Sequence, residues 1–292
     1  MLRNAFAYIT RKWPKSLLLF AIILLMGTLS LIGLSMKGAT QKASSESLGS
    51  ITNSFSMQIN RRTNPGTPRG AGNLRGEDIE KISQVEGITS SIKRINAIAD
   101  ILDHEIIETE ETLQNQSPER AKHFKNTLMV TGVNDSSKED KFVSGAYKLV
   151  QGEHLTDKDK NQILMHEDLA KKNGLKVGDK VRLKSNLYDA DNEKGANETV
   201  EVTIKGLFSG KNQAPLTYAQ ELYEDTLISD LDTAAKLYGN TVQTATYEDA
   251  TFFAKGDQDL DKLIEKIKAL DIPWNYYDLV KSSSNYPALQ KS

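Results

Sequence analysis

Residues 17–36 read LLLFAIILLMGTLSLIGLSM, and this stretch decides how the rest of the chain is organised. It contains no charged side chain, and its only polar side chains are Thr28, Ser30 and Ser35. A helix rises about 1.5 Å per residue, so a segment of this length spans roughly 30 Å, the thickness of a bilayer's hydrocarbon core. The sequence therefore predicts one transmembrane helix over residues 17–36, with everything after it on one side of a membrane.

The flanks of this stretch predict which side that is. Basic residues next to a membrane span stay on the cytoplasmic side. Only Lys37 and Lys42 follow the span closely, whereas four basic residues and no acidic ones precede it. These topology residues are Arg3, Arg11, Lys12 and Lys15. The N-terminus is therefore expected in the cytoplasm and the main domain on the extracytoplasmic side of the cell membrane.

The predicted helix is expected to anchor the chain through its large apolar side chains. These anchor residues include Leu17, Phe20, Ile23, Leu24, Leu31 and Met36. The competing interpretation is a cleaved signal peptide, whose apolar core is about 7–15 residues long and ends in a small-x-small site. A cut after Ala39 would place Lys37 where a small residue is needed, so we expect an uncleaved anchor.

Residues 1–16 are expected to lie along the inner membrane surface. Leu2, Phe6, Ile9 and Trp13 recur at helical spacing and form an apolar stripe, with basic residues elsewhere. Such a helix buries its apolar face at the boundary between headgroups and acyl chains. The alternative for this segment is a frayed terminus.

The composition argues against a nucleic acid or an acidic polymer as a partner and against stabilisation by disulfide bonds. Charged residues make up 26% of the chain, yet the net charge is only −2, so neither a nucleic acid nor an acidic polymer is indicated as a partner. Cysteine is absent, so an extracytoplasmic domain of this size must be stabilised by its apolar core instead of disulfides. This pattern is typical of a bacterial surface.

The order of predicted elements indicates an α+β fold. A strand–helix–strand pattern near residues 55–102 returns near residues 250–280, and two such halves form a ferredoxin-like split βαβ subdomain. The middle of the chain reads as a mostly β insertion. The predicted architecture is one N-terminal transmembrane helix, an extracellular split βαβ subdomain and a mostly β inserted subdomain.

This interpretation divides the chain into five parts. They are the interfacial segment 1–16, the transmembrane helix 17–36, the βαβ subdomain 37–134 with 246–285, the insertion 135–245, and residues 286–292 as the start of a further membrane part.

Two elements of this scheme are specific enough to be compared with a structure. A helix is expected over residues 257–270, with one apolar stripe that buries five large side chains. The stripe consists of Leu260, Leu263, Ile264, Ile267 and Leu270. A strand is expected over residues 142–150.

No phosphate-binding loop is complete in the sequence. Gly70-Ala-Gly72 begins like a dinucleotide-binding loop, but Arg75 stands where the third glycine is needed. Gly206 to Lys211 resembles a P-loop that is one residue too short, and Asn212 stands where Ser or Thr is required. We interpret the two segments as a Pro/Gly-rich loop and the end of a strand.

Metal and nucleophile sites are equally incomplete. Asp189, Asp191 and Glu193 begin like a calcium loop, but its glycine and its final glutamate are replaced by Lys194 and Val200. The histidines are scattered, and no Gly-x-Ser-x-Gly motif occurs. We expect no catalytic residue, no metal and no cofactor, and therefore no enzyme.

One run of basic residues belongs to none of these motifs. Arg61, Arg62, Arg69 and Arg75 follow one another without an intervening acid. They could contact anionic lipid headgroups or an anionic cargo, and the alternative is a mobile, solvated loop.

A series of short motifs runs through the middle of the chain. They are VTGVN at 130–134, LVQGEHL at 149–155, GLKVGDKVRL at 174–183 and VTIKGLF at 202–208. Their order and spacing resemble the extracytoplasmic core domain of MacB-type ABC transporter permeases. The residues that match the family motifs are Gly132, Gly152, Ala170, Gly174, Gly178, Asp179 and Gly206. Small departures occur at Asn134, Glu153 and Asn173.

Further segments resemble the Vex-type permeases of Gram-positive bacteria, which are linked to peptide export. These are residues 59–62, 66–72, 133–142 and 282–288.

The resemblance implies a permease subunit that works with a separate ATP-binding ABC subunit and a second permease subunit, as a homo- or heterodimer, in the lipid bilayer. It implies that ATP hydrolysis drives outer-domain movement and export of a peptide or drug-like cargo. Members of the family have three further spans after the outer domain, so we expect this chain to be a fragment or a truncated product. The alternative function is a single-pass surface protein that binds a ligand without transport.

Overall fold

The computed structural model describes residues 53–281. The predicted membrane helix at 17–36, its basic flank and the interfacial segment 1–16 lie outside the described residues, as do residues 286–292. Within residues 53–281, no helix combines the length and the apolar character that a membrane span needs.

The described chain is built around one large β-sheet. The strands are β1 (Ser54–Ile59), β2 (Leu74–Arg75), β3 (Ile88–Ile101), β4 (Thr127–Val133), β5 (Lys148–Gly152), β6 (Gln162–His166), β7 (Lys180–Ser185), β8 (Thr199–Ser209), β9 (Thr226–Asp230), β10 (Thr246–Tyr247), β11 (Asp249–Ala254) and β12 (Tyr277–Lys281). The helices are α3 (Gly76–Ser83), α4 (Glu110–Gln114), α5 (Pro118–His123), α6 (Asp140–Val143), α7 (Glu167–Lys172), α8 (Leu231–Lys236) and α9 (Leu260–Lys268), with short 3₁₀ turns between them.

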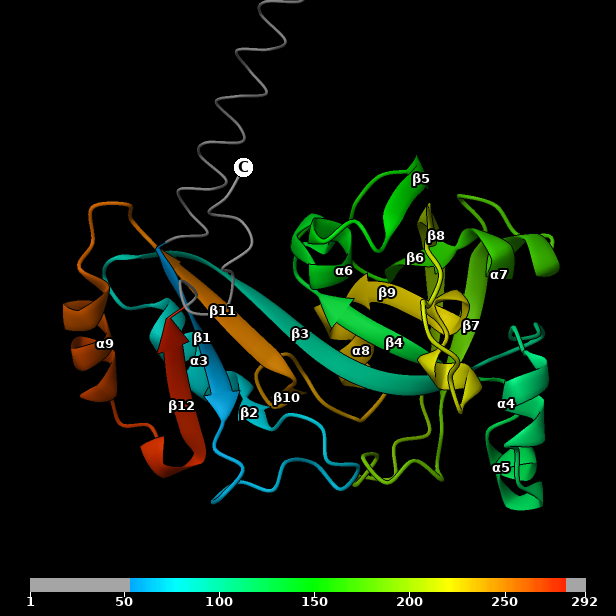
Figure 1. Cartoon of the computed structure of the whole chain (residues 1–292), viewed down its shortest axis with the longest axis horizontal. Coiled ribbons are helices and arrows are strands. Elements are labelled where there is room, and N and C mark those ends of the chain that lie inside the picture. The colour runs from blue at the N-terminus through cyan, green and yellow to red at the C-terminus, as the bar shows by residue number, and fades with distance from the viewer. Residues whose placement is uncertain (1–52, 282–292) are drawn as a thin grey trace, which may run out of the picture. The chain divides into compact units, whose positions relative to one another are not determined.

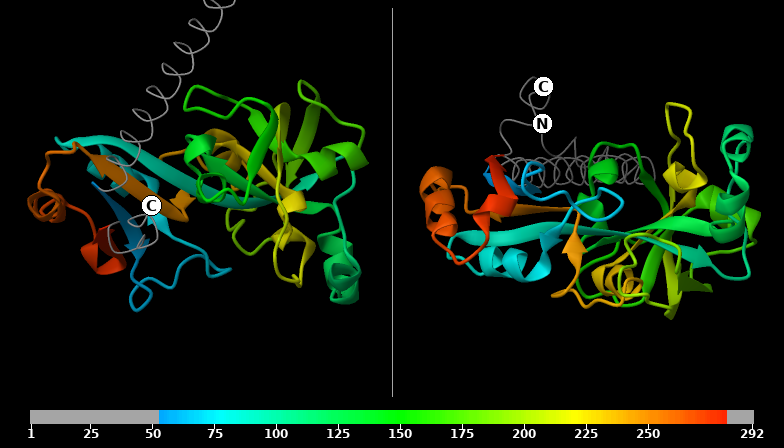
Figure 2. Two further views of the ribbon diagram at one scale, coloured as in Figure 1. Left: turned by 45° about the horizontal axis from the view of Figure 1, so that its top comes forward. Right: turned by 90° about the horizontal axis from the view of Figure 1, so that it is seen from below.

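The long strand β3 joins two parts of this sheet. The strand order is β12-β1-β11-β3-β4-β9-β6-β8-β5, with β7 pairing with both β3 and β8. We call β12, β1, β11 and the first residues of β3 the first half-sheet, and the last residues of β3 with β4 to β9 the second half-sheet. Figure 1 shows β3 running from one half to the other, and both views of Figure 2 show the same arrangement.

The first half-sheet is antiparallel throughout, with one register shift between β11 and β3 at Phe253 and Ala254. β1 pairs antiparallel with β11 and β12, and β11 pairs antiparallel with β3. Alternating side chains of β1, such as Phe55 and Met57, are fully buried, as a strand with one face on the core requires. The helices α3 and α9 each contribute two buried side chains to the same core, Ile79 and Ile82 from α3 and Leu263 and Ile267 from α9.

The helix α9 is shorter than the sequence predicted. It begins at Leu260 because the carboxylate of Asp259 accepts the backbone N–H of Asp261 at 3.0 Å and so caps the helix. Only two of the five stripe residues are fully buried, and Leu260, Ile264 and Leu270 remain half-buried. Figure 1 shows why: α9 lies beside β12, at the end of the sheet, where fewer side chains can cover it.

The second half-sheet is mixed. β4 pairs parallel with β9, and β6 pairs parallel with β8, while the remaining pairs are antiparallel. A small second core lies here beside the main one. Its buried members are Val133, Tyr147, Leu155, Leu164, Phe208 and Ile228.

The predicted strand over residues 142–150 is wrong. The carboxylate of Glu139 accepts the N–H of Lys141 at 2.9 Å and caps the short helix α6 at this place. Gly145, with φ of 78°, then turns the chain, and the strand β5 begins only at Lys148. A cap and a turn therefore occupy most of the segment that the sequence predicted as one strand.

Candidate functional site

The segments that resembled phosphate loops are occupied by contacts within the protein. The backbone N–H of Gly72 donates to Oε2 of Glu248 at 2.7 Å, so this amide faces a carboxylate that would repel a phosphate. Gly206 lies inside β8, where it pairs with Gly152 of β5. Neither segment presents the row of free amides that holds a phosphate group.

The segment that resembled a calcium loop is neutralised by an arginine. Nε of Arg69 lies 2.7 Å from Oδ1 of Asp189 and 3.1 Å from Oδ2 of Asp191. A guanidinium therefore occupies the place that a cation would take. Over residues 53–281, no group of three or more His, Asp or Glu side chains is arranged to hold a metal ion.

One serine–histidine contact needs separate treatment, because it is a pairing that nucleophilic enzymes use. Oγ of Ser136 lies 2.8 Å from Nδ1 of His154, and it also accepts the backbone N–H of Leu155 at 2.8 Å. Ser136 is completely buried, so no substrate can reach its hydroxyl. Burial also lowers the pKa of His154, as it does when an imidazole supports a packed loop. The contact is structural.

The residues that match the family motifs hold turns and close contacts. Gly132 lies in β4, where a Cβ would approach the Cβ of Ala234 to 2.5 Å, so its lack of a side chain lets α8 pack directly on the sheet. Gly174, with φ of 65°, ends α7 in the left-handed conformation that glycine adopts without strain. Ala170 is buried within α7.

The remaining motif residues shape the tight turns of the second half-sheet. The N–H of Gly178 donates to Ile204 O at 2.8 Å, and the carboxylate of Asp179 accepts the N–H of Lys176 at 2.9 Å. Gly152 and Gly206 lie opposite each other where β5 meets β8. None of these motif residues forms a chemical site, and they lie in several separate turns.

Two of the four arginines of the charged run are engaged in ion pairs. Besides Arg69, Arg75 donates from Nε to Asp78 Oδ2 at 2.7 Å, and Tyr277 donates its hydroxyl to the same oxygen at 2.8 Å. Arg61 donates to Gly70 O at 2.7 Å and so closes its own loop. These contacts connect parts of the loop to the rest of the domain, while all four arginines remain exposed.

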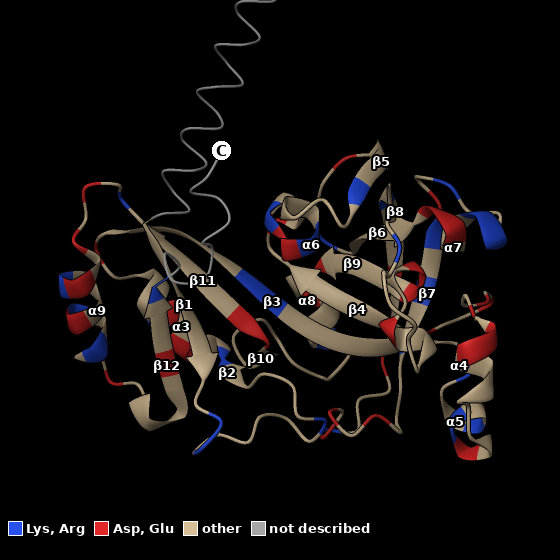
Figure 3. Ribbon diagram, viewed as in Figure 1, with Lys and Arg blue, Asp and Glu red and all other residues tan. Residues whose placement is uncertain are grey.

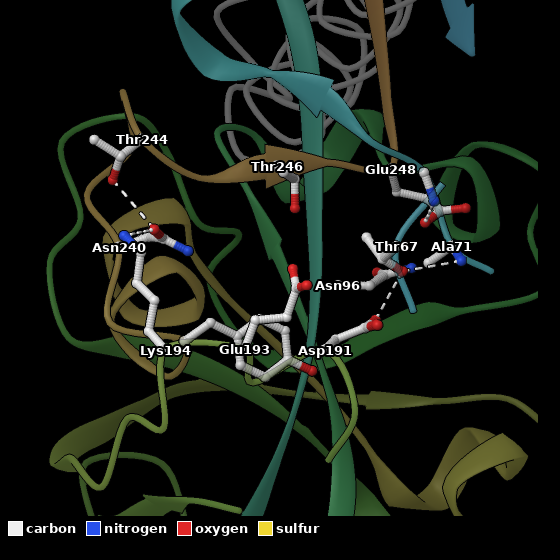
Figure 4. A pocket seen from close by; sticks show the side chains of 12 residues that line it. Thr67, Ala71, Asn96, Asp191, Glu193, Lys194, Asn240, Thr244, Thr246 and Glu248 are labelled. Carbon is white, nitrogen blue, oxygen red and sulfur yellow. Dashed lines mark hydrogen bonds between the residues drawn. The ribbon is translucent and has the colours of Figure 1, made fainter. Parts of the chain in front are cut away.

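The contacts of Arg69 lie beside a small polar pocket, of about 160 Å³ (Figure 4). Its lining comes from four regions far apart in sequence: Thr67, Ala71 and Gly72; Asn96 of β3; Asp191, Glu193 and Lys194; and the stretch from Tyr238 to Glu248. Figure 4 shows Thr67 bonded to Asp191 and Asn240 bonded to Thr244 around it.

The contacts around Tyr238 are the most concentrated charged network next to this pocket. Nη2 of Arg69 donates to the Tyr238 hydroxyl at 2.9 Å, and that hydroxyl donates to Asp189. The backbone N–H of Arg69 donates to Oδ1 of Asp191 at 2.8 Å. Burial raises the pKa of Asp189 and of Tyr238, and Arg69 opposes both shifts. The group is therefore an internal ion-pair network and not a set of free ligands.

Sequence reasoning identified parts of this network but not the whole. It singled out Arg69 as part of a charged run and Asp189 with Asp191 as part of an incomplete calcium loop, and it did not identify Tyr238. The usable signal was a run of arginines without intervening acids and, elsewhere in the chain, a pair of aspartates, since buried charges need opposite partners.

Charged residues of both signs are interspersed over both half-sheets, and the view in Figure 3 shows no continuous basic face. This agrees with the near-neutral net charge of −2. An interface that neutralises nucleic-acid phosphates would need clustered Lys and Arg.

Comparison with known proteins gives the family. The chain matches the family model of the MacB-like periplasmic core domain over residues 16–270. The chain belongs to this family. A relative of this MacB-like chain is the uncharacterized ABC transporter permease YclI of Bacillus subtilis (strain 168), which is 23% identical over 313 residues. The alignment covers 98% of this chain and 63% of YclI, so the chain spans less than two thirds of that relative's length.

Two solved structures are similar to this MacB-like chain. The periplasmic region of MacB from Actinobacillus actinomycetemcomitans is 16% identical, with a TM-score of 0.47, and the match covers 84% of this chain and 95% of that one. The extracellular domain of the noncanonic ABC-type transporter YknZ from Gram-positive bacteria is 12% identical, with a TM-score of 0.42 and coverages of 78% and 100%.

Proposed function

We propose that this chain is the N-terminal part of a permease subunit of a MacB-type ABC exporter. The observation that carries the proposal is the family match over residues 16–270, which includes the apolar stretch 17–36 as well as the whole of β1 to β11. The domain is extracytoplasmic and residues 17–36 anchor it in the cell membrane, with the N-terminus inside. The charge bias of the flanks supports this orientation.

The subunit works with partners that supply what it lacks. ATP is hydrolysed by a separate ATP-binding ABC subunit, and a second permease subunit completes the membrane part. Support comes from the name of the relative YclI, an ABC transporter permease, and from the described residues, in which the two glycine-rich segments hold no free phosphate-binding loop. The cargo is a peptide or drug-like molecule, as the resemblance to Vex-type permeases implies.

The extracytoplasmic part consists of a ferredoxin-like split βαβ subdomain, at 37–134 and 246–285, and an inserted subdomain at 135–245. The order β12-β1-β11-β3, with α3 between β1 and β3 and α9 between β11 and β12, supports this division. The boundary near residue 134 falls at the end of β4, which pairs with β3 on one side and with β9 on the other.

Site-specific labelling in intact cells tests the proposal. The chain has no cysteine, so a single Asn197→Cys substitution places the only thiol in an exposed loop, and Thr10→Cys is the matched control before the span. A membrane-impermeant maleimide should label residue 197 in intact cells and residue 10 only after the membrane is opened. The reverse pattern would refute the exporter topology.

The gene sequence beyond Ser292 separates transport from ligand binding alone. Three further apolar spans downstream would support a permease subunit. Their absence, with residue 197 labelled from outside, would leave a single-pass surface protein.

A further inference from the structure

One edge of the long strand β3 is unpaired at its centre. β11 pairs with β3 as far as Arg94, and β7 pairs with β3 only from Ala99. Neither strand pairs with residues 95–98, which we call the open edge. β4 pairs with these residues on the other edge, so one ladder instead of two holds β3 here, and a sheet bends more readily where fewer backbone hydrogen bonds hold it.

A side chain takes the place of the missing strand at the open edge. The Tyr238 hydroxyl accepts the backbone N–H of Ile98 at 3.1 Å. Tyr238 is 8% exposed and lies just after α8, which packs on β3 and β4. A buried backbone N–H without an acceptor is costly, so this bond fixes where Tyr238 must be.

Two loops then hold Tyr238 in place. Arg69 belongs to the loop between β1 and β2, in the first part of the chain, and Asp189 and Asp191 belong to the loop between β7 and β8, in the second half-sheet. Arg69 bonds to both aspartates and to the Tyr238 hydroxyl, and Thr67 adds a bond to Asp191 at 3.0 Å. We call Arg69, Asp189, Asp191 and Tyr238 the Arg69 joint.

The Arg69 joint is held by charge-assisted hydrogen bonds. Asp189 is 4% exposed, and its two oxygens face Arg69 and the Tyr238 hydroxyl. Charge-assisted hydrogen bonds of this kind are about twice as strong as neutral ones. Removing Arg69 would leave the buried carboxylate of Asp189 without its charged partner, which is strongly unfavourable.

A second contact near the open edge is looser. Arg94 pairs with Asp249 of β11, but its Nη1 atom lies 3.9 Å from Oε1 of Glu139, beyond hydrogen-bond distance. Oε1 of Glu139 and Nε of Arg94 are buried without a hydrogen-bond partner. This contact does not fix the two half-sheets as the Arg69 joint does.

We propose that the Arg69 joint is a lock that holds the two half-sheets at one angle across the open edge of β3. With the joint closed, the domain moves as one body. With the joint open, the half-sheets bend relative to each other about residues 95–98.

Distance measurements on the full chain test this proposal. In the cysteine-free chain, spin labels at Lys268→Cys on α9 and Lys171→Cys on α7 report the distance between the two halves, since both positions are exposed. The parent should give one narrow distance distribution. Arg69→Gln should broaden or shift it, and the matched control Arg62→Gln, in the same loop, should leave it unchanged.

A more conservative variant, Asp191→Asn, tests the proposal in case Arg69→Gln does not fold. Asp191→Asn keeps an oxygen to accept the N–H of Arg69 but removes one charge from the joint, so it should broaden the distribution less than Arg69→Gln. Far-ultraviolet circular dichroism shows whether each variant is folded. A narrow parental distribution in a folded Arg69→Gln or a folded Asp191→Asn protein would overturn the proposal.

Discussion

The two half-sheets bury different kinds of residue. In the first, β1 and β11 stack Phe55 on Phe252, with ring centroids 5.3 Å apart, inside the main apolar core, which continues into the second half-sheet. The second buries an aromatic cluster around Phe208 together with many polar groups, including Asp225 and Asp230. The first part is therefore stabilised mainly by apolar burial, and the second also by specific hydrogen bonds.

Buried acids of the second half-sheet accept backbone N–H groups. Asp225 accepts the N–H of Ile107, in the connection between β3 and β4, at 2.7 Å, and Asp230 caps α8 through the N–H of Thr233 at 3.1 Å. The first part of the chain buries the acid Asp78, which Arg75 and Tyr277 contact.

The largest effect should come from the aromatic cluster. Phe208 is fully buried, and its ring lies 4.6 Å from Tyr147 between centroids. Phe208→Ala should lower the free energy of unfolding by about 3–5 kcal/mol, measured by urea denaturation. Hydrogen exchange should rise first in β5 and β8.

Phe252→Ala is the matched change in the first half-sheet. It should cost a similar free energy, but exchange should rise in β1, β3 and β11, the strands that surround it. If both variants loosen the same strands, the contrast between the halves is wrong.

The next effect concerns the helix that covers the first core. Ile267 is fully buried in α9, whereas Ile264, one turn away, is half-buried. Ile267→Ala should destabilise the domain by about 2–4 kcal/mol. Ile264→Ala should lower the free energy of unfolding clearly less. Equal losses of this free energy in urea denaturation would show that α9 is covered on both sides.

A smaller effect, of the opposite sign, is expected at Asp225. Burial raises the pKa of this carboxyl to about 8, because desolvation disfavours its charged form, and its Oδ2 atom has no hydrogen-bond partner. The folded chain keeps the proton while the unfolded chain releases it near pH 4, so stability falls as pH rises from about 4 to about 8. Asp225→Asn should remove this slope and raise stability at pH 7.

Thermal unfolding between pH 4 and pH 9 measures the effect of this change. Asp225→Asn and the parent should converge near pH 4 and separate steadily as the pH rises to about 8. Parallel curves over the whole range would mean that Asp225 is ionised in the folded protein. This prediction concerns the second half-sheet, where Asp225 directly precedes β9.

The smallest effect should come from a surface ion pair. Nζ of Lys180 lies 3.0 Å from Oε1 of Glu201, and both side chains are more than half exposed. Glu201→Gln should change the free energy of unfolding by less than about 0.5 kcal/mol. A larger loss would show that the charged surface of the second half-sheet contributes to its stability.

Much of the secondary structure could be predicted from the sequence, because local signals agree with it. The two strand–helix–strand patterns predicted near residues 55–102 and 250–280 are present, as β1, α3 and β3 and as β11, α9 and β12. The strand predicted over residues 142–150 is wrong where a cap at Glu139 and a turn at Gly145 break the segment. Hydrophobic periodicity contains no information on such side-chain caps.

The Arg69 joint could not be assembled from the sequence. Arg69 and Asp191 lie 122 positions apart, and Arg69 and Tyr238 lie 169 apart. Their pairing depends on where β3 is left open, which follows from the register of three strands and not from any motif. The family motif residues were found by spacing because each one shapes a local turn.

The neighbouring positions of β1 and β12 have a mechanical consequence. Phe55, near the start of the described chain, pairs with Lys281 at its end, and the two strands run antiparallel. The polypeptide thus enters and leaves the domain through adjacent strands, about 5 Å apart. Tension applied through these two ends would load the β1–β12 ladder one hydrogen-bonded pair at a time, and would leave the second half-sheet and the open edge unstretched until that ladder had parted.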